Sequence, residues 1–181
     1  MGKQLTEISE SLQQFIEEQK IFFVGTAASE GRVNVSPKGM DSLRVIGPNK
    51  LIWLNLTGSG NETAAHLLRN SRMTLMFCAF EGNPMILRVY GDAKIFHERD
   101  EQYHMYIEQF DDSPGARQII ELDINLVQTS CGFGVPIMEY KEERTYLSSW
   151  AEKKKRGKVK EYWNTHNTVS IDGFETGINE P

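Results

Sequence analysis

The stretch Leu51–Phe80, LIWLNLTGSGNETAAHLLRNSRMTLMFCAF, places the strongest constraint on how this chain can fold. It begins with a short apolar run that contains Trp and Ile, which favours a buried strand. The small residues of Thr57–Gly60 interrupt this run, Asn61 can cap a helix, and Ala64–Leu68 are good helix formers. A second apolar run follows from Arg72. The stretch therefore predicts a strand, a glycine-rich turn, a short helix and a second strand.

The glycine-rich turn is a candidate phosphate site. Unpaired backbone N–H groups at a helix N-terminus favour anions, and small residues before the helix allow an anion to approach closely. The turn lacks the GK[ST] ending of a P-loop and does not spell GxGxxG, so neither nucleotide fingerprint applies. A structural turn that precedes a capped helix explains these residues equally well.

The composition is that of an ordinary globular protein, with 181 residues, of which 39% are hydrophobic and 25% charged. A net charge of −5 disfavours nucleic acid and anionic membranes as partners. No apolar run approaches the roughly 20 residues of a membrane span. The two cysteines, Cys78 and Cys131, are too few for a metal site, so we expect reduced thiols, no bound metal and a cytoplasmic location.

The other segments predict further strands and helices. Apolar residues at helical spacing predict an amphipathic helix within residues 5–19. Short alternating or apolar runs predict further strands at 21–27, 32–36, 43–46, 85–96 and 122–130. We expect helices at 98–110 and 144–156, a short helix or turn at 117–121, and a loosely held stretch over the last ten or so residues. We expect residues 1–140 to form one domain and residues 141–181 a helical extension packed on it.

Two charged residues have two interpretations each. Lys38 follows a proline at a strand end, where it could face an anion or an electron-rich ring, or simply be solvated. Arg88 falls on one face of a predicted strand, where it could contact an anion or pair with an acidic residue at the barrel rim. The sequence leaves both choices open.

The order of these pieces resembles the pyridoxamine 5′-phosphate oxidase-like family of FMN-binding split barrels. The resemblance covers residues 21–136 and rests on VNVSPKG, LIWLNLTGSGNETAAHLLRNSRMTLMF, LRVYGDAKIF and QTSCGFGVP in that order. It implies a mainly β fold (β+α), a six-stranded antiparallel split β-barrel with flanking helices. It also implies a homodimer with FMN in a groove between the subunits.

The resemblance also implies which residues meet the cofactor. The strand 33–38 would lie along the isoalloxazine ring, with Lys38 near it, and the strand end 55–57 would meet the polar edge of the ring and the ribityl chain. Asn61 and Thr63 match positions that bind the phosphate, whereas residues 128–131 and Trp150 are weaker candidates. The expected cofactor-binding residues are Val35, Ser36, Lys38, Asn55, Leu56, Thr57, Asn61, Thr63, Arg88, Ser130, Cys131 and Trp150.

The chain departs from the family pattern at two places. The oxidase carries a basic Ser-Arg-Lys run at the helix start, where this chain has residues 61–63, Asn-Glu-Thr, so another cation (Lys38, Arg72 or Arg88) would have to compensate. The arginine- and histidine-bearing substrate segment of the oxidase is also missing from the C-terminal part. We therefore do not expect pyridoxamine phosphate as the substrate.

The leading hypothesis is an FMN-dependent oxidoreductase that acts on a small organic substrate. The sequence shows no nucleophile–base pair, so the catalytic residues stay unassigned, and for His66 we favour a structural role over one near the cofactor. The alternatives are a flavin-binding or flavin-sensing module without turnover, a split barrel that uses haem or deazaflavin, and a cofactor-free barrel that binds another phosphorylated ligand.

Overall fold

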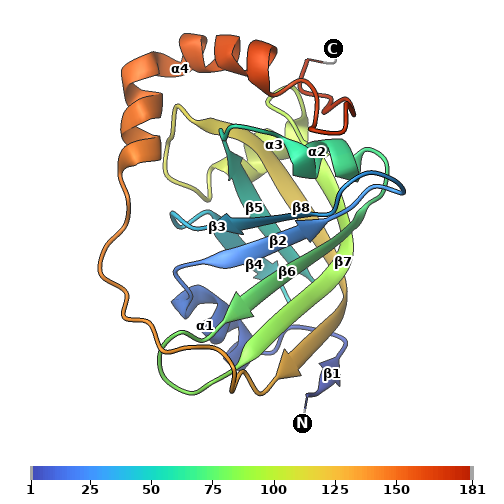
Figure 1. Ribbon diagram of the computed structural model, residues 1–181, viewed down its shortest axis with the longest axis vertical. Coiled ribbons are helices and arrows are strands. Elements are labelled where there is room, and N and C mark those ends of the chain that lie inside the picture. Colours follow the sequence, from blue (N-terminus) through green and yellow to red (C-terminus); the bar gives the residue numbers. More distant parts are fainter. Residues whose placement is uncertain (1, 180–181) are drawn as a thin grey trace.

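The computed structural model describes residues 2–179 and consists of one twisted antiparallel sheet that curls into an open barrel (Figure 1). Within these residues the sheet has eight strands in the order β3-β2-β6-β7-β8-β5-β4, with β1 paired to β8. The strands are β1 (Gln4–Leu5), β2 (Phe22–Thr26), β3 (Asn34–Lys38), β4 (Leu43–Gly47), β5 (Lys50–Leu56), β6 (Arg72–Cys78), β7 (Ile86–Phe96) and β8 (Ala116–Ser130). The terminal strands β3 and β4 are not paired with each other, so the barrel stays split.

This architecture confirms the predicted split β-barrel. The described part of the sheet contains eight strands rather than six. One of them, β1, is only two residues long and pairs Gln4 with Gln128, so no alternating pattern could have revealed it.

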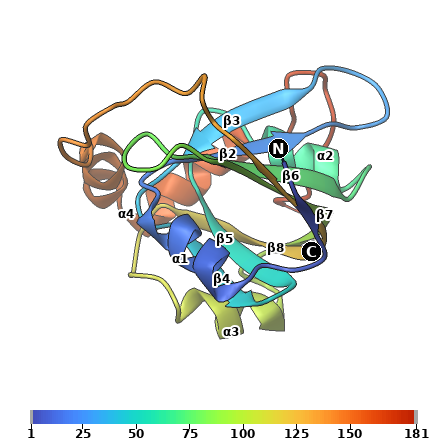
Figure 2. The same ribbon diagram turned by 90° about the horizontal axis from the view of Figure 1, so that it is seen from below.

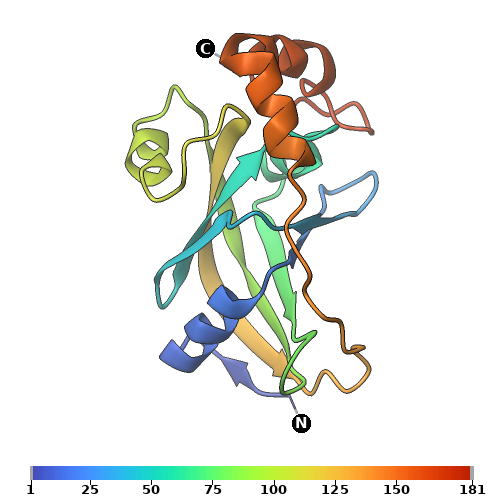
Figure 3. The same cartoon turned by 90° about the vertical axis from the view of Figure 1, so that its left-hand side faces the viewer.

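The helices lie outside the barrel. Those of the described residues are α1 (Glu10–Glu18), α2 (Glu62–Leu67), α3 (Glu101–Ile107) and α4 (Tyr146–His166). The view from below places α1 beside β4 and α3 beyond β5 and β8 (Figure 2). An extended segment runs along the side of the barrel and carries the chain from β8 to α4 at the opposite end (Figure 3). No helix in the described range is long and apolar enough to cross a membrane.

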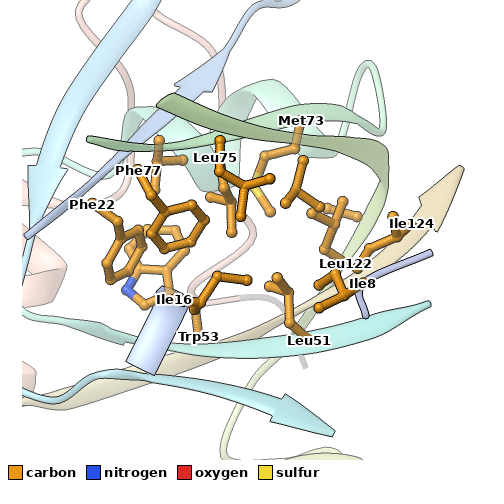
Figure 4. Packing of buried hydrophobic residues seen from close by; sticks show 14 of the residues in the cluster. Ile8, Ile16, Phe22, Leu51, Trp53, Met73, Leu75, Phe77, Leu122 and Ile124 are labelled. Carbon is orange, nitrogen blue, oxygen red and sulfur yellow. The ribbon is translucent and has the colours of Figure 1, made fainter. Parts of the chain in front are cut away.

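The main core fills the inside of the barrel and fixes β5 and β6 on either side of the glycine-rich turn (Figure 4). Phe22 stacks on Phe77 with ring centroids 5.8 Å apart, and the edge of Phe22 meets Trp53 at 6.3 Å. Helix α1 adds Leu12 and Ile16 to this core, as its apolar stripe predicts. Buried apolar area of this kind is the main favourable term in folding.

The prediction of a short helix or turn at residues 117–121 is wrong. These residues are the first part of the long strand β8, in which Ile120 pairs with Trp53 of β5 and with Ile95 of β7. Because this part of β8 is buried on both faces, its sequence lacks the alternation that marks a half-buried strand.

The expectation of a loosely held C-terminus is also wrong over the residues that the structure describes. We call residues 167–178 the C-terminal segment. It turns back on itself through a bridge between Val169 and Glu175, and the Thr176 hydroxyl donates a hydrogen bond of 2.6 Å to the Asn167 carbonyl oxygen. Thr176 and Asn167 are both fully buried. The segment lies beside α2 in Figure 1, so it borders the region of the glycine-rich turn.

Candidate functional site

A cleft of about 450 Å³ opens where β3, the end of β5, the glycine-rich turn and α2 meet. Its walls include alternate residues of β3, the loop Gly58–Asn61 and one residue of the C-terminal segment, Ile171. The core holds β5 on one side of this loop, while α2 follows directly on the other side. The fold thus gathers polar residues from three separate parts of the sequence, residues 32–38, 55–66 and Arg117, around one cavity.

Six of the twelve residues predicted from sequence line this cleft. They are Ser36, Lys38, Asn55, Leu56, Asn61 and Thr63. Thr57 lies outside the lining, where its hydroxyl donates to the Gly115 carbonyl oxygen at 2.8 Å and accepts from Trp163 Nε1 at 2.8 Å. Val35 alternates with Ser36 along β3, so its side chain faces the other way and is 67% exposed.

The remaining four predicted residues do not line the cleft of this chain. Arg88 Nη1 donates to Ser130 Oγ at 3.3 Å on the neighbouring strands β7 and β8, and Cys131 follows β8 as an exposed free thiol. Trp150 lies on α4 and packs edge-on against Tyr162, with ring centroids 5.2 Å apart. A single copy of the chain therefore keeps these four out of the cleft, although Trp150 lines a neighbouring pocket together with Thr57.

Asn61 does not cap α2 with its side chain, contrary to the expectation from sequence. It occupies the position before the helix, but its side chain makes no capping hydrogen bond. Instead, Asn61 Oδ1 accepts a long bond of 3.4 Å from Asn55 Nδ2, and Asn61 Nδ2 is left buried without a partner. The amide is thus available to a group in the cleft.

Buried polar atoms without partners concentrate at this cleft. Within residues 2–179, five buried side-chain nitrogen or oxygen atoms lack a hydrogen-bond partner, and four of them belong to cleft-lining residues. These four are Ser36 Oγ, Asn61 Nδ2, His66 Nε2 and Arg117 Nε. Buried polar groups in folded proteins are almost always paired, so four orphans around one cavity indicate a site for a polar ligand.

Arg117 is a site residue that the sequence reasoning missed. Its guanidinium donates from Nη1 to the Gly60 carbonyl oxygen at 3.0 Å and to Asn167 Oδ1 at 2.7 Å, and from Nη2 to Asn55 Oδ1 at 3.2 Å. Its exposed fraction is 4%, and burial lowers the pKa of Arg117 to about 9, so it stays cationic at neutral pH. The available signal was an arginine close to the apolar pair Ile119–Ile120, but the assignment of residues 117–121 to a helix or turn hid it.

Lys38 brings a second positive charge to the same cleft. Burial first, and then the positive charge of Arg117, lower the pKa of Lys38 to about 8. Its Nζ atom lies 5.2 Å from the centre of the Trp53 ring, whose face can stabilise a cation. Two cations that repel each other in a partly buried cleft make that cleft favourable for an anion.

His66 also lines the cleft, although the sequence favoured a structural role for it. Its Nδ1 atom lies 3.1 Å from Thr26 Oγ1, which also accepts from Asn34 Nδ2 at 3.4 Å. Because Thr26 accepts from the Asn34 amide, its own hydroxyl proton can be donated to Nδ1. When the Thr26 hydroxyl donates in this way, the ring proton is on Nε2, the atom without a partner. His66 is then a hydrogen-bond donor to the cleft.

A second cleft of about 760 Å³ lies between α1, the β3–β4 turn and the segment that leads to α4. It is larger, but none of the unpartnered buried polar atoms of the described chain belongs to its lining. The same part of the chain contains no group of three or more His, Cys, Asp or Glu side chains arranged to hold a metal ion. We therefore place the candidate site in the smaller cleft.

Comparison with known proteins gives consistent matches. Residues 8–131 match the family model for pyridoxamine 5′-phosphate oxidase. A relative from Aspergillus flavus, the pyridoxamine 5′-phosphate oxidase family protein ustO, is 37% identical over 185 residues, which cover 92% of this chain and 74% of that protein.

Solved structures share the fold at low sequence identity. A variant of HupZ from Group A Streptococcus aligns with a TM-score of 0.56 and 18% identity, covering 68% of this chain and 99% of HupZ. A protein from Lactobacillus delbrueckii that is described as a pyridoxamine 5′-phosphate oxidase aligns with a TM-score of 0.52 and 21% identity. The alignment covers 68% of this chain and 98% of that protein. At these identities the likeness concerns the fold alone.

Proposed function

Because the chain belongs to the pyridoxamine 5′-phosphate oxidase family, we propose that its cleft binds FMN and that the protein is an FMN-dependent oxidoreductase acting on a small organic substrate. The observation that carries the proposal is the convergence of four unpartnered buried polar atoms on one cleft whose lining, among the described residues, includes two cations without an acidic partner. FMN carries a phosphate, ribityl hydroxyls and ring oxygens, which accept hydrogen bonds from donors of this kind.

In this proposal the side chains of the cleft bind and orient the cofactor. Arg117, His66 and Asn61 would hold the phosphate, and Ser36 and Lys38 would meet the polar parts of the ring and the ribityl chain. Bound FMN would supply the electron transfer that amino-acid side chains cannot perform. No side chain is assigned a catalytic proton transfer.

We also propose that the protein is a homodimer with the cofactor between the subunits. Apolar side chains are exposed on β3, where Val35 is 67% exposed, and just before it, where Val33 is 73% exposed and borders the cleft. More follow in the extended segment after β8, where Phe133 is 82% and Ile137 89% exposed. Exposed patches of large apolar side chains often mark protein–protein interfaces. A Val35→Glu variant should therefore run as a monomer in size-exclusion chromatography with light scattering, and a wild-type monomer that binds FMN would contradict the dimer.

The direct test is the visible absorption spectrum of freshly purified protein, before and after FMN is added and the sample is desalted. We expect flavin bands that survive desalting, and bleaching of these bands by NADH or NADPH would support an oxidoreductase. Bound FMN without reduction would favour a flavin-binding or flavin-sensing module. A colourless protein that releases all added FMN would refute the proposal. Thermal-shift assays with FAD, haem and deazaflavin would then test the other cofactors, since a ligand that binds only the folded state raises its melting temperature.

A further inference from the structure

The buried guanidinium of Arg117 has no acidic partner. Among residues 2–179, no Asp or Glu side chain forms an ion pair with it, and its Nε–H group donates to no other atom. The three hydrogen bonds it does make all end on neutral oxygens, those of Gly60, Asn55 and Asn167. An uncompensated buried charge is strongly unfavourable, so the ligand-free fold holds a cation that an anion from outside would neutralise.

We infer that Arg117 is the cation that binds the anionic group of the ligand, and that Asn167 of the C-terminal segment is the residue that positions it. The identity of the ligand as FMN rests on the proposed function, whereas the anion site rests on the contacts of Arg117 itself. In this arrangement Arg117 of β8 replaces the basic residues that the oxidase carries at the start of α2. Asn167 of the C-terminal segment holds Arg117 in position.

Asn167 connects Arg117 to the glycine-rich turn. Its Oδ1 atom accepts from Arg117 Nη1 at 2.7 Å, and its Nδ2 atom donates to the carbonyl oxygens of Gly58 at 3.2 Å and Ser59 at 3.5 Å. Its own backbone is fixed by the Trp163 carbonyl oxygen at 2.8 Å and by the Thr176 hydroxyl at 2.6 Å. Because Asn167 is fully buried and bonded at every polar atom, it fixes the guanidinium relative to the turn.

The one carboxylate in the lining of the cleft, that of Glu62, is hydrogen-bonded to the C-terminal segment. Glu62 accepts hydrogen bonds from the backbone N–H of Ile171 at 3.1 and 3.2 Å, so its negative charge is directed to the C-terminal segment. Asp172 forms an ion pair with Arg32, and its carboxylate also accepts from the Arg32 backbone N–H at 2.7 Å. These contacts close one side of the cleft and leave Arg117 and Lys38 as its unpaired cations among the described residues.

The other arginines considered from sequence are engaged elsewhere. Arg72 Nε donates to Asn70 Oδ1 at 3.2 Å, and Arg88 donates to Ser130. Neither lines the cleft. Of these three arginines, it is therefore Arg117 that compensates for the basic residues missing from the start of α2.

The test compares the affinities of FMN and riboflavin, which differ only in the phosphate. The ratio of the two dissociation constants, measured by quenching of flavin fluorescence, isolates the contribution of the anion from general effects on folding. In the wild-type protein we expect a clear preference for FMN. Arg117→Gln should reduce this preference by about 10- to 100-fold, the range for charge-assisted hydrogen bonds, with little change for riboflavin. Arg72→Gln, outside the cleft, serves as the matched control and should keep the wild-type ratio.

Two further variants separate positioning from a structural role. Asn167→Ala removes the contact that holds the guanidinium, and should reduce the FMN preference by several-fold while riboflavin binding is kept. Asn167→Asp places a carboxylate against Arg117, which neutralises its charge, and should reduce the preference as much as Arg117→Gln does. If Asn167 only stabilised the fold, both variants would weaken FMN and riboflavin binding equally, and that result would overturn the assignment. Arg117→Lys keeps the charge and should restore part of the preference.

Inorganic phosphate tests the anion site independently of FMN. Phosphate should raise the melting temperature of the wild-type protein above that seen in sodium chloride of the same ionic strength, and should have no such effect on Arg117→Gln. A protein that binds phosphate in this way but neither flavin would disprove the proposed function and keep the anion site. Equal effects of phosphate on both proteins, or an unchanged FMN preference in Arg117→Gln, would refute the inference.

Discussion

The pH dependence of stability provides a sharp test of the charge balance in the cleft. The pKa of Lys38 falls from its ordinary value of 10.5 to about 8, chiefly because the side chain is buried and also because Arg117 is near. Between these two pH values the unfolded chain binds more protons at this position than the folded protein does. Stability contributed by this group therefore rises with pH from about 8 to 10.5. The difference in pKa corresponds to about 3 kcal/mol in the free energy of unfolding over the whole window.

The assay is urea unfolding of the wild-type protein and of Lys38→Met at several pH values between 7 and 10. The free energy of unfolding of the wild type minus that of the variant should increase across this range, because only the wild type loses the unfavourable buried charge. Lys94→Met, on the exposed side of β7, removes a lysine outside the cleft and serves as the control. A wild-type–Lys38→Met difference that stays constant from pH 7 to 10 would refute the assignment of a buried, charge-coupled lysine.

The same group makes ligand binding depend on pH. An anion in the cleft stabilises protonated Lys38, so the affinity for FMN should be constant between about pH 7, where the phosphate is a dianion, and about pH 8. Above that pH it should fall by up to about tenfold per pH unit. Fluorescence titrations at pH 7 to 8.5, below the pKa of about 9 of Arg117, measure this slope, and Lys38→Met should abolish it in this range. A slope that persists in Lys38→Met would mean that another group is responsible.

Two further predictions concern the scaffold. A Cβ atom at Gly91 would overlap the carbonyl oxygen of Asp123 at the bulge between β7 and β8. Gly91→Ala should therefore lower the free energy of unfolding, measured in urea, by about 3 kcal/mol or more. Gly157 in α4 has open space around it, so the control Gly157→Ala should be neutral or stabilising by up to about 1 kcal/mol. If the two variants were equally stable, the close approach at Gly91 would be wrong. Trp163→Phe keeps the aromatic packing of α4 but loses the hydrogen bond to Thr57, which should lower the free energy of unfolding by about 1 kcal/mol, and an unchanged urea midpoint would show that this bond contributes nothing.

The sequence by itself determined the scaffold and about half of the proposed site. Alternation and apolar runs identify half-buried strands such as β2 and β7. The turn and α2 followed from the small residues, the Asn-Glu-Thr start and the alanines. These features are local, because backbone geometry and the alternation of buried and exposed side chains are set by residues only a few positions apart in the sequence.

The tertiary structure alone decided which charges meet in the cleft. The 117–121 stretch read as a helix or turn because a strand buried on both faces has no alternation, and only its pairing with β5 and β7 places Arg117 behind the glycine-rich turn. Asn167 is 50 residues further along the chain than Arg117, and nothing local to either residue indicates their contact. Burial, and with it the lowered pKa values of Lys38 and Arg117, depends on how distant segments pack. A one-dimensional pattern can therefore predict which segments form the barrel, whereas the electrostatics of the site arise only when those segments come together.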